Sequence, residues 1–166
     1  MQNNKTYWKE FLVFRTELNY LGYYKQILQN RVLRLNLFVA FATSGSVGAW
    51  VVWDGIPQVW AGIIAGSAII NTIRPHLRYE KRMESLSGLY VDISNLCLEF
   101  EKNWYYITKG EWSDEEIHLN RIDLIKRRDS SLAAWLPADK LPQLPKFLKK
   151  AEEDAAKYLA KYAEEL

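Results

Sequence analysis

Residues 35–53, LNLFVAFATSGSVGAWVVW, and residues 56–73, IPQVWAGIIAGSAIINTI, decide the fold because neither stretch contains a formally charged side chain. At about 1.5 Å per helical residue, each stretch would reach about 27 to 28 Å, which approaches the hydrocarbon thickness of a bilayer. Backbone amides in hydrocarbon must bond within their own segment, so each stretch is expected to be a helix. We therefore predict an all-α protein with a two-helix transmembrane hairpin at residues 35–73.

The short connection and the flanking charges predict the orientation of this hairpin. Asp54 and Gly55 are turn residues, and Pro57 suits the first turn of the second helix. Cations predicted to lie at the membrane surface are Arg31, Arg34, Arg74, Arg78, Lys81 and Arg82. Because positive charge stays on the cytoplasmic side, both termini are expected in the cytoplasm, with no removable signal. The alternative is a buried hairpin within a soluble bundle.

Small and polar side chains recur along both uncharged stretches. The positions predicted to line a pore or to pack helices are Asn36, Thr43, Ser44, Gly48, Gly62, Gly66, Ser67 and Asn71. Small residues four positions apart let helices approach closely in lipid. Since a hairpin buries little by itself, we expect a homo-oligomer, with a tetramer as the working subunit number. The hydroxyl and amide groups either face a pore or bond to backbone carbonyls.

Helical patterns predict the domains on either side of the hairpin. Residues 1–34 form an amphipathic cytoplasmic helix, and residues 74–166 form a cytoplasmic helical domain. Apolar residues from Tyr79 to Ile107 follow coiled-coil spacing, which predicts a long helix at 75–109 that packs within a bundle. A capping box at Ser113 and Glu116 begins a helix at 113–134, and a proline-rich linker precedes a C-terminal helix at 146–165. Gly88 in the long helix marks either a bend or a close contact.

No motif of catalytic chemistry is present in the sequence. There is no P-loop, no nucleophile elbow and no paired metal-ligand spacing. The single cysteine, Cys97, is expected to be a small core residue, and the two histidines, His76 and His118, are expected to be structural or solvated. We therefore predict no enzyme, no cofactor and no metal site.

Two basic groups flank the proline-rich linker and are candidates for an anion-binding site. They comprise Lys126, Arg127 and Arg128 before the linker and Lys146, Lys149 and Lys150 after it. If they converge, they suit the phosphates of a nucleotide or an oligonucleotide. The alternative is compensation of a helix dipole together with an ordinary solvated face.

The arrangement of these elements resembles a known group of membrane effectors. An amphipathic helix, the basic junction RVLRLN at 31–36, a hairpin with a very short turn and a long helix beginning RPHLRYEKR at Arg74 are similar to SLATT-type two-transmembrane effectors of bacterial conflict systems. The similarity covers about residues 5–110. The channel-forming effector of the Hailong system looks like a comparable protein. This resemblance implies perforation or depolarisation of the inner membrane when phage is sensed through a nucleotide, a nucleic acid or a regulatory protein. This sequence has no recognisable SAVED or other named sensor module, so the activating ligand stays open.

Two functions are consistent with these sequence features. The first is an oligomeric pore-forming effector, bound to membrane lipid, whose cytoplasmic helices open or close the pore. The second is a membrane-anchored scaffold that recruits a cytoplasmic partner and conducts nothing.

Overall fold

The computed structural model describes the backbone of residues 2–52, 57–73, 79–136 and 141–165, and side chains there except at 2, 42–52, 57–61, 63, 64, 73, 80 and 165. These residues form five helices and no strand, which confirms the all-α class. The chain divides into two compact units. Unit 1 comprises Met1–Lys25 and Glu84–Leu166, and unit 2 comprises Gln26–Met83.

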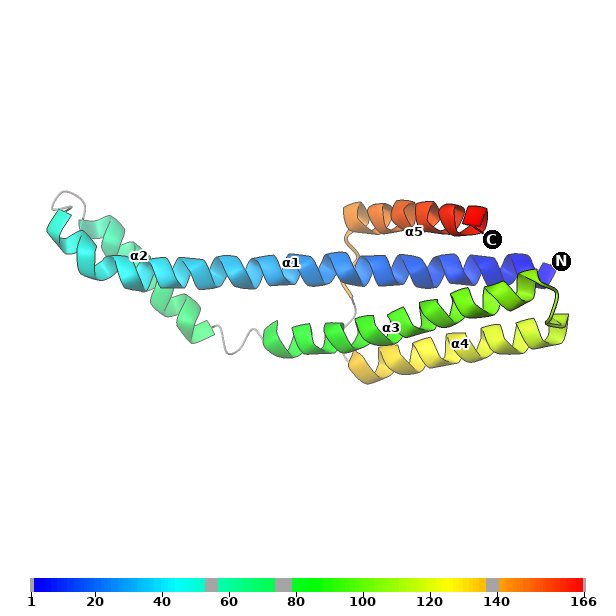
Figure 1. The fold of residues 1–166 in the computed structure, drawn as a ribbon. Coiled ribbons are helices and arrows are strands. Elements are labelled where there is room, and N and C mark those ends of the chain that lie inside the picture. The colour runs from blue at the N-terminus through cyan, green and yellow to red at the C-terminus, as the bar shows by residue number, and fades with distance from the viewer. Residues whose placement is uncertain (1, 53–56, 74–78, 137–140, 166) are drawn as a thin grey trace. The chain divides into compact units, whose positions relative to one another are not determined.

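The helices follow one another along the chain in the order that Figure 1 labels. They are α1 (Gln2–Val52), α2 (Pro57–Ile73), α3 (Tyr79–Thr108), α4 (Asp114–Trp135) and α5 (Pro145–Glu165), as Figure 1 shows. α1 is continuous for 51 residues, so the N-terminal amphipathic stretch and the first uncharged stretch belong to one helix. No proline interrupts residues 2–52, and proline is the residue that most strongly breaks a helix.

The core of unit 1 lies where the first part of α1 packs against α3. Phe11 and Phe100 stack with ring centroids 5.5 Å apart, and Phe14 meets Phe100 edge-on at 4.7 Å. All three side chains are fully buried. The buried residues of α3 are Leu86, Leu89, Ile93, Leu96, Cys97, Phe100, Asn103 and Ile107. The predicted stripe of α3 therefore faces the interior of a helical bundle, as its width indicated.

A buried polar junction connects three helices of unit 1. The Oδ1 atom of Asn120 on α4 accepts hydrogen bonds from the Tyr7 hydroxyl and from Nδ2 of Asn103, each 3.0 Å long. Burial raises the pKa of Tyr7 above its ordinary value, so the phenol stays a donor. Since buried polar groups are stable only when paired, this junction helps to fix how α1, α3 and α4 align.

The connection between α3 and α4 has the caps that the sequence predicts. Gly110 adopts a φ of 71°. Its amide donates to the carbonyl of Ile107, and the amide of Glu111 donates to Tyr106, which is a Schellman pattern. The predicted capping box at Ser113 and Glu116 is confirmed, because the hydroxyl and the carboxylate each accept from the other residue's backbone amide. Both ends of this turn are therefore stabilised by residues close in sequence.

Unit 2 contains the later part of α1 together with α2, which runs back from the end of α1 (Figure 1). In the part of the chain that the structure describes, no helix is both long enough and apolar enough to cross a bilayer. The predicted turn at Asp54 and Gly55 lies outside the described residues. The transmembrane hairpin therefore stays a prediction.

Candidate functional site

The predicted pore-lining or helix-packing positions of unit 2 occupy different environments. Ser67 is buried at 5% exposure, whereas Asn71 is exposed. A β-carbon added at Gly62 or Gly66 would meet no described atom within 4 Å, so the surface of α2 is open at both glycines. Asn36 is half-buried, and its Oδ1 has no hydrogen-bond partner in the described part of the chain. The side chains of Thr43 and Ser44 are not among those described, nor are the surroundings of Gly48.

A row of exposed apolar side chains marks the α1 segment of unit 2. Leu33, Leu37 and Phe41 are 55%, 61% and 63% exposed, and Phe38 beside them is 40% exposed. The first three are four residues apart and therefore share one helix face. Ile69 on α2 is 58% exposed. Large apolar surface of this kind on one chain normally has lipid or another protein surface against it.

Only some of the cations predicted at the membrane surface lie among the described residues. Arg31, Arg34 and Lys81 are exposed, and Arg82 is half-buried. Arg74 and Arg78 lie outside the described residues, as does His76. The exposed cations are available to water or to acidic lipid headgroups.

The first basic group of the predicted anion site is largely paired within the protein. Arg127 lies 2.8 Å from Glu99 and 3.5 Å from Asp123. Arg128 lies 3.6 Å from Glu17, and its guanidinium sits 5.1 Å from the ring centroid of Phe14. Lys126 is exposed. These residues lie within α4, not in its last turn, so they do not compensate the C-terminal dipole of this helix.

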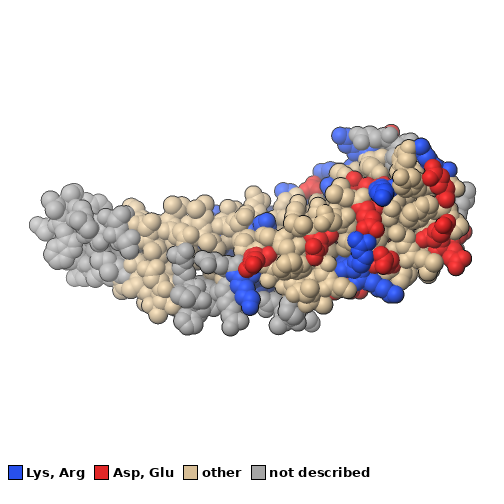
Figure 2. All heavy atoms as spheres, turned by 60° about the horizontal axis from the view of Figure 1, so that its bottom comes forward, with Lys and Arg blue, Asp and Glu red and all other residues tan. Residues whose placement is uncertain are grey.

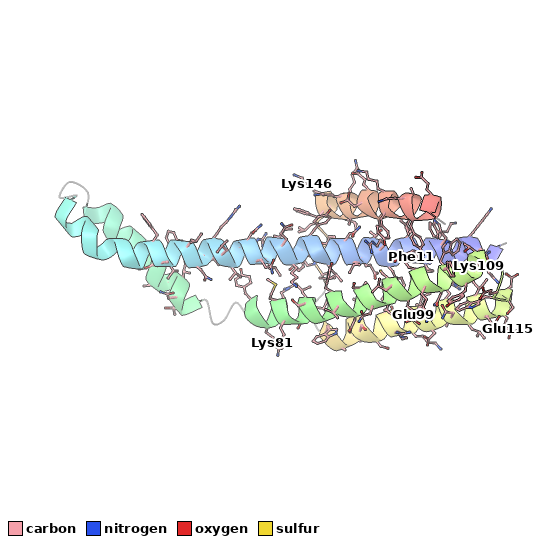
Figure 3. The ribbon with its side chains drawn as sticks, viewed as in Figure 1. Phe11, Lys81, Glu99, Lys109, Glu115 and Lys146 are labelled. Carbon is pink, nitrogen blue, oxygen red and sulfur yellow. The ribbon has the colours of Figure 1, made fainter. Side chains whose placement is uncertain are left out.

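The second basic group lies on another helix and has other partners. Lys146, Lys149 and Lys150 are exposed at the start of α5. Figure 3 shows Lys146 on the side of α1 opposite to α4. The ammonium of Lys150 lies 4.6 Å from the ring centroid of Tyr23 on α1. The structure therefore does not bring the two groups together, and Figure 2 shows basic and acidic side chains intermixed on the visible face.

A polar cluster that the sequence analysis missed holds α5 against α1 and α3. The guanidinium of Arg15 lies 3.6 Å from the ring centroid of Tyr158, whose hydroxyl donates a 2.7 Å hydrogen bond to Glu101. Tyr162 donates to the backbone carbonyl of Glu101 at 2.9 Å. Burial, followed by this bond to Glu101, raises the pKa of Tyr158 to about 12. The signal in the sequence was the pair of tyrosines four residues apart on the apolar side of the last helix.

Further contacts tie the same helix to α1. Nδ2 of Asn19 donates to the carbonyl of Ala151 at 3.3 Å, and the Tyr23 hydroxyl donates to the carboxylate of Asp154. Ala151 and Ala155 are fully buried, and small residues of this kind let two helices approach closely. Each hydrogen bond contributes only about 0.5 to 1.5 kcal/mol net, because water replaces it when the helices separate. α5 is therefore docked through a narrow alanine seam and several polar contacts of modest strength.

The groups with potential reactivity are either buried in the core or exposed to solvent. Cys97 is 1% exposed, and burial raises the pKa of its thiol to about 12, which confirms its prediction as a core residue. His118 is exposed on α4. Trp104 lies 4.6 Å from Trp8 between ring centroids, so it packs among aromatic rings of α1. Over the described ranges, no three His, Cys, Asp or Glu side chains gather as metal ligands.

Comparisons with protein-family models, with curated proteins and with solved structures found no match to this chain. The resemblance to SLATT-type effectors accordingly stays a prediction. The function is therefore inferred from the chain's own residues and contacts.

Proposed function

We propose that the protein is an oligomeric effector of the inner membrane that forms an ion-conducting pore, or disrupts the bilayer, in antiphage defence. The observation that carries the proposal is the exposed apolar row on α1, in which Leu37 is 61% and Phe41 is 63% exposed. This row continues into the uncharged stretch at 35–53, which pairs with a second at 56–73. Transfer of two such uncharged stretches from water into lipid lowers their free energy.

Association of several copies is supported by groups in unit 2 that one chain leaves open. Gly62 and Gly66 present a surface on which no described atom lies within 4 Å of an added β-carbon. A neighbouring helix can approach closely there. The copies would then surround a shared axis, which is the requirement for a pore.

Control of the pore is assigned to unit 1, with α5 as the element that a signal displaces. Its contacts with Arg15, Asn19 and Glu101 are hydrogen bonds and a cation–π contact, which a ligand or partner can replace with similar ones. Lys146 and Lys149 are exposed on the same helix and suit the phosphates of a nucleotide or nucleic acid, or an acidic protein surface. A ligand shifts the equilibrium between docked and displaced α5 only if it binds the displaced state more tightly than the docked state.

The proposal is tested by ion flux with a matched pair of charge substitutions. Leu37 and Leu119 are 61% and 60% exposed, but only Leu37 lies within the uncharged stretch 35–53. We expect Leu37→Lys to abolish ion leakage from cells and from liposomes that contain the purified full chain, while Leu119→Lys leaves it unchanged. Wild-type oligomers that pass no ions in liposomes, with or without nucleotide or nucleic acid, would exclude the pore.

A second function, a non-conducting membrane anchor that recruits a cytoplasmic partner, is favoured by one contact in α2. The Thr72 hydroxyl donates to the carbonyl of Ala68 at 2.9 Å, so this polar group bonds to its own helix. An anchor tolerates replacement of residues 35–73 by an unrelated hairpin, whereas a pore does not. Protection of cells from phage by the chimaera would therefore support the anchor.

A further inference from the structure

An apolar line runs along the outer face of α3. Val91, Leu98 and Tyr105 are 55%, 59% and 42% exposed, although the same helix has a complete buried face. They are seven residues apart, and seven residues make almost two helical turns, so the three side chains follow one another along the axis.

The neighbours of Leu98 show that no other helix of unit 1 covers this line. At about 100° per residue, Leu98 points away from Phe100, which is fully buried against α1. Glu99, on one side, pairs with Arg127 of α4, and Glu101, on the other, accepts from Tyr158 of α5. The line therefore lies between the two flanking helices and opposite the core. An isolated exposed leucine such as Leu119 needs no explanation, but an aligned series is typical of a helix contact.

We infer that this line is a contact between copies of the chain, in which α3 of one copy packs parallel to α3 of a second copy. We take the two copies to be parallel, and the inference rests on the proposed function, in which the hairpins gather several copies in one bilayer. Rotation about an axis along the helices then brings each residue of the line against itself. Val91, Leu98 and Tyr105 suit such a contact because they carry no charge that would repel its equivalent.

The polar residues beside the line favour this arrangement. Lys102 and Asn95 lie on one flank of the line. Ser94 and Glu101 lie on the other flank. In a parallel pair, opposite flanks face each other, so Lys102 lies level with Glu101 of the second copy, whose side chain is 18% exposed. Asn95 lies level with the uncharged Ser94, so among these four flanking residues the charges that face each other, Lys102 and Glu101, are opposite.

The α3 contact buries little surface, so its formation depends on the membrane segment to hold the copies together. Three partly exposed side chains remove much less surface from water than a stable dimer needs, which is about 800 Å² on each partner. Hairpins held in one bilayer raise the effective concentration of α3 for its copies. Formation of the α3 contact is then an intramolecular step of the oligomer.

An antiparallel contact is the competing arrangement, and it has a different signature. It would place Val91 against Tyr105 of the second copy. It would also place Lys102 opposite Asn95, so Lys102 would no longer face a carboxylate. Cysteine substitutions distinguish the two directions.

The experiment uses the full chain in membranes, with Cys97→Ala to remove the buried thiol, and a short bis-maleimide cross-linker. We expect Val91→Cys alone to give several-fold more cross-linked dimer than Leu119→Cys, which reports chance encounters at similar exposure. Equal yields at the two positions would overturn the inference. So would efficient linkage of a Val91→Cys copy to a Tyr105→Cys copy without linkage of Val91→Cys to itself.

Ion flux from the same variants separates this inference from the proposed function. Flux without Val91→Cys dimers would refute the α3 contact and leave the pore in place. Val91→Cys dimers without any flux would refute the pore and support the α3 contact. Leu98→Lys, an exposed substitution outside the core, is expected to lower the dimer yield of Val91→Cys several-fold without changing the helical content of the chain.

Discussion

A β-carbon at Gly88 would lie 2.5 Å from the indole ring of Trp135, so the end of α4 packs directly on the backbone of α3. The same indole donates a 2.8 Å hydrogen bond from Nε1 to the carboxylate of Asp92, one turn further along α3. Of the two interpretations of Gly88 from the sequence, the close contact is therefore confirmed. Glycine is required here for space, since any side chain would occupy the position of the ring.

Gly88→Ala is expected to lower the free energy of unfolding by about 1 to 3 kcal/mol, because the added methyl group must push the ring of Trp135 aside. Gly22→Ala is the matched control. Its β-carbon would lie 3.6 Å from the ring of Tyr90, an ordinary contact, and alanine favours the helix. Thermal unfolding of the purified chain measures both. Equal melting temperatures for the two variants would contradict the close contact.

Tyr158→Phe is expected to loosen α5 from α1 and α3. The substitution removes the hydroxyl that donates to Glu101 at 2.7 Å, at a cost of about 1 kcal/mol for one lost bond with a partly buried acceptor. Hydrogen exchange of the α5 amides should accelerate, while exchange in α3 stays unchanged. Tyr106→Phe removes a hydroxyl from a half-buried ring of α3 and serves as the control. Uniform acceleration throughout unit 1 would argue against separate release of α5.

Glu17→Gln is expected to make the stability of unit 1 less dependent on pH. Burial raises the pKa of Glu17 above 4.5, with Arg128 opposing the shift. A raised carboxyl pKa means that the folded state binds the proton more tightly. Its stabilising effect is thus complete at pH values below 4.5 and is lost as the pH rises through the folded pKa. As the pH rises through the folded pKa of Glu17, the melting temperature of the wild type should therefore fall relative to that of Glu17→Gln.

The pKa of the capping carboxylate, Glu116, is shifted in the opposite direction, so Glu116 provides a control for the pH experiment. Hydrogen bonds from the amide and hydroxyl of Ser113 lower the pKa of Glu116. Its contribution is present above the ordinary carboxyl pKa and is lost as the pH falls through the folded value. The melting temperature of the wild type should therefore approach that of Glu116→Gln as the pH falls. Identical pH profiles for the Glu17 and Glu116 variants would contradict both assignments.

The Cys97 thiol is expected to react with maleimide only when unit 1 unfolds. It is 1% exposed, and burial raises its pKa to about 12, so both access and thiolate formation are suppressed. Labelling should be slow in the native chain and fast in denaturant. A Leu119→Cys variant that also carries Cys97→Ala should label rapidly in both states. Rapid native labelling of Cys97 would place the residue outside the core.

The helix ends could be predicted from the sequence because their signals act over a few residues. Ser113 and Glu116 satisfy amides within one turn, and Gly110 permits the positive φ that ends α3. The apolar spacing of α3 likewise predicted which of its faces is buried. Partners across helices were not predictable in this way. Arg127 pairs with Glu99, 28 residues earlier, and Tyr158 bonds to Glu101, 57 residues earlier.

The sequence by itself determined the all-helical class, the ends of α4, the core position of Cys97 and the absence of charge over residues 35–53 and 56–73. Only the tertiary structure decided that Trp135 packs on Gly88, that Arg127 and Arg128 are paired, and that the two basic groups lie on separate sides of α1. Caps and periodicity depend on hydrogen bonds and burial within one helix, which neighbouring residues encode. Pairing depends on how helices align, and that alignment arises from the combined packing of distant side chains.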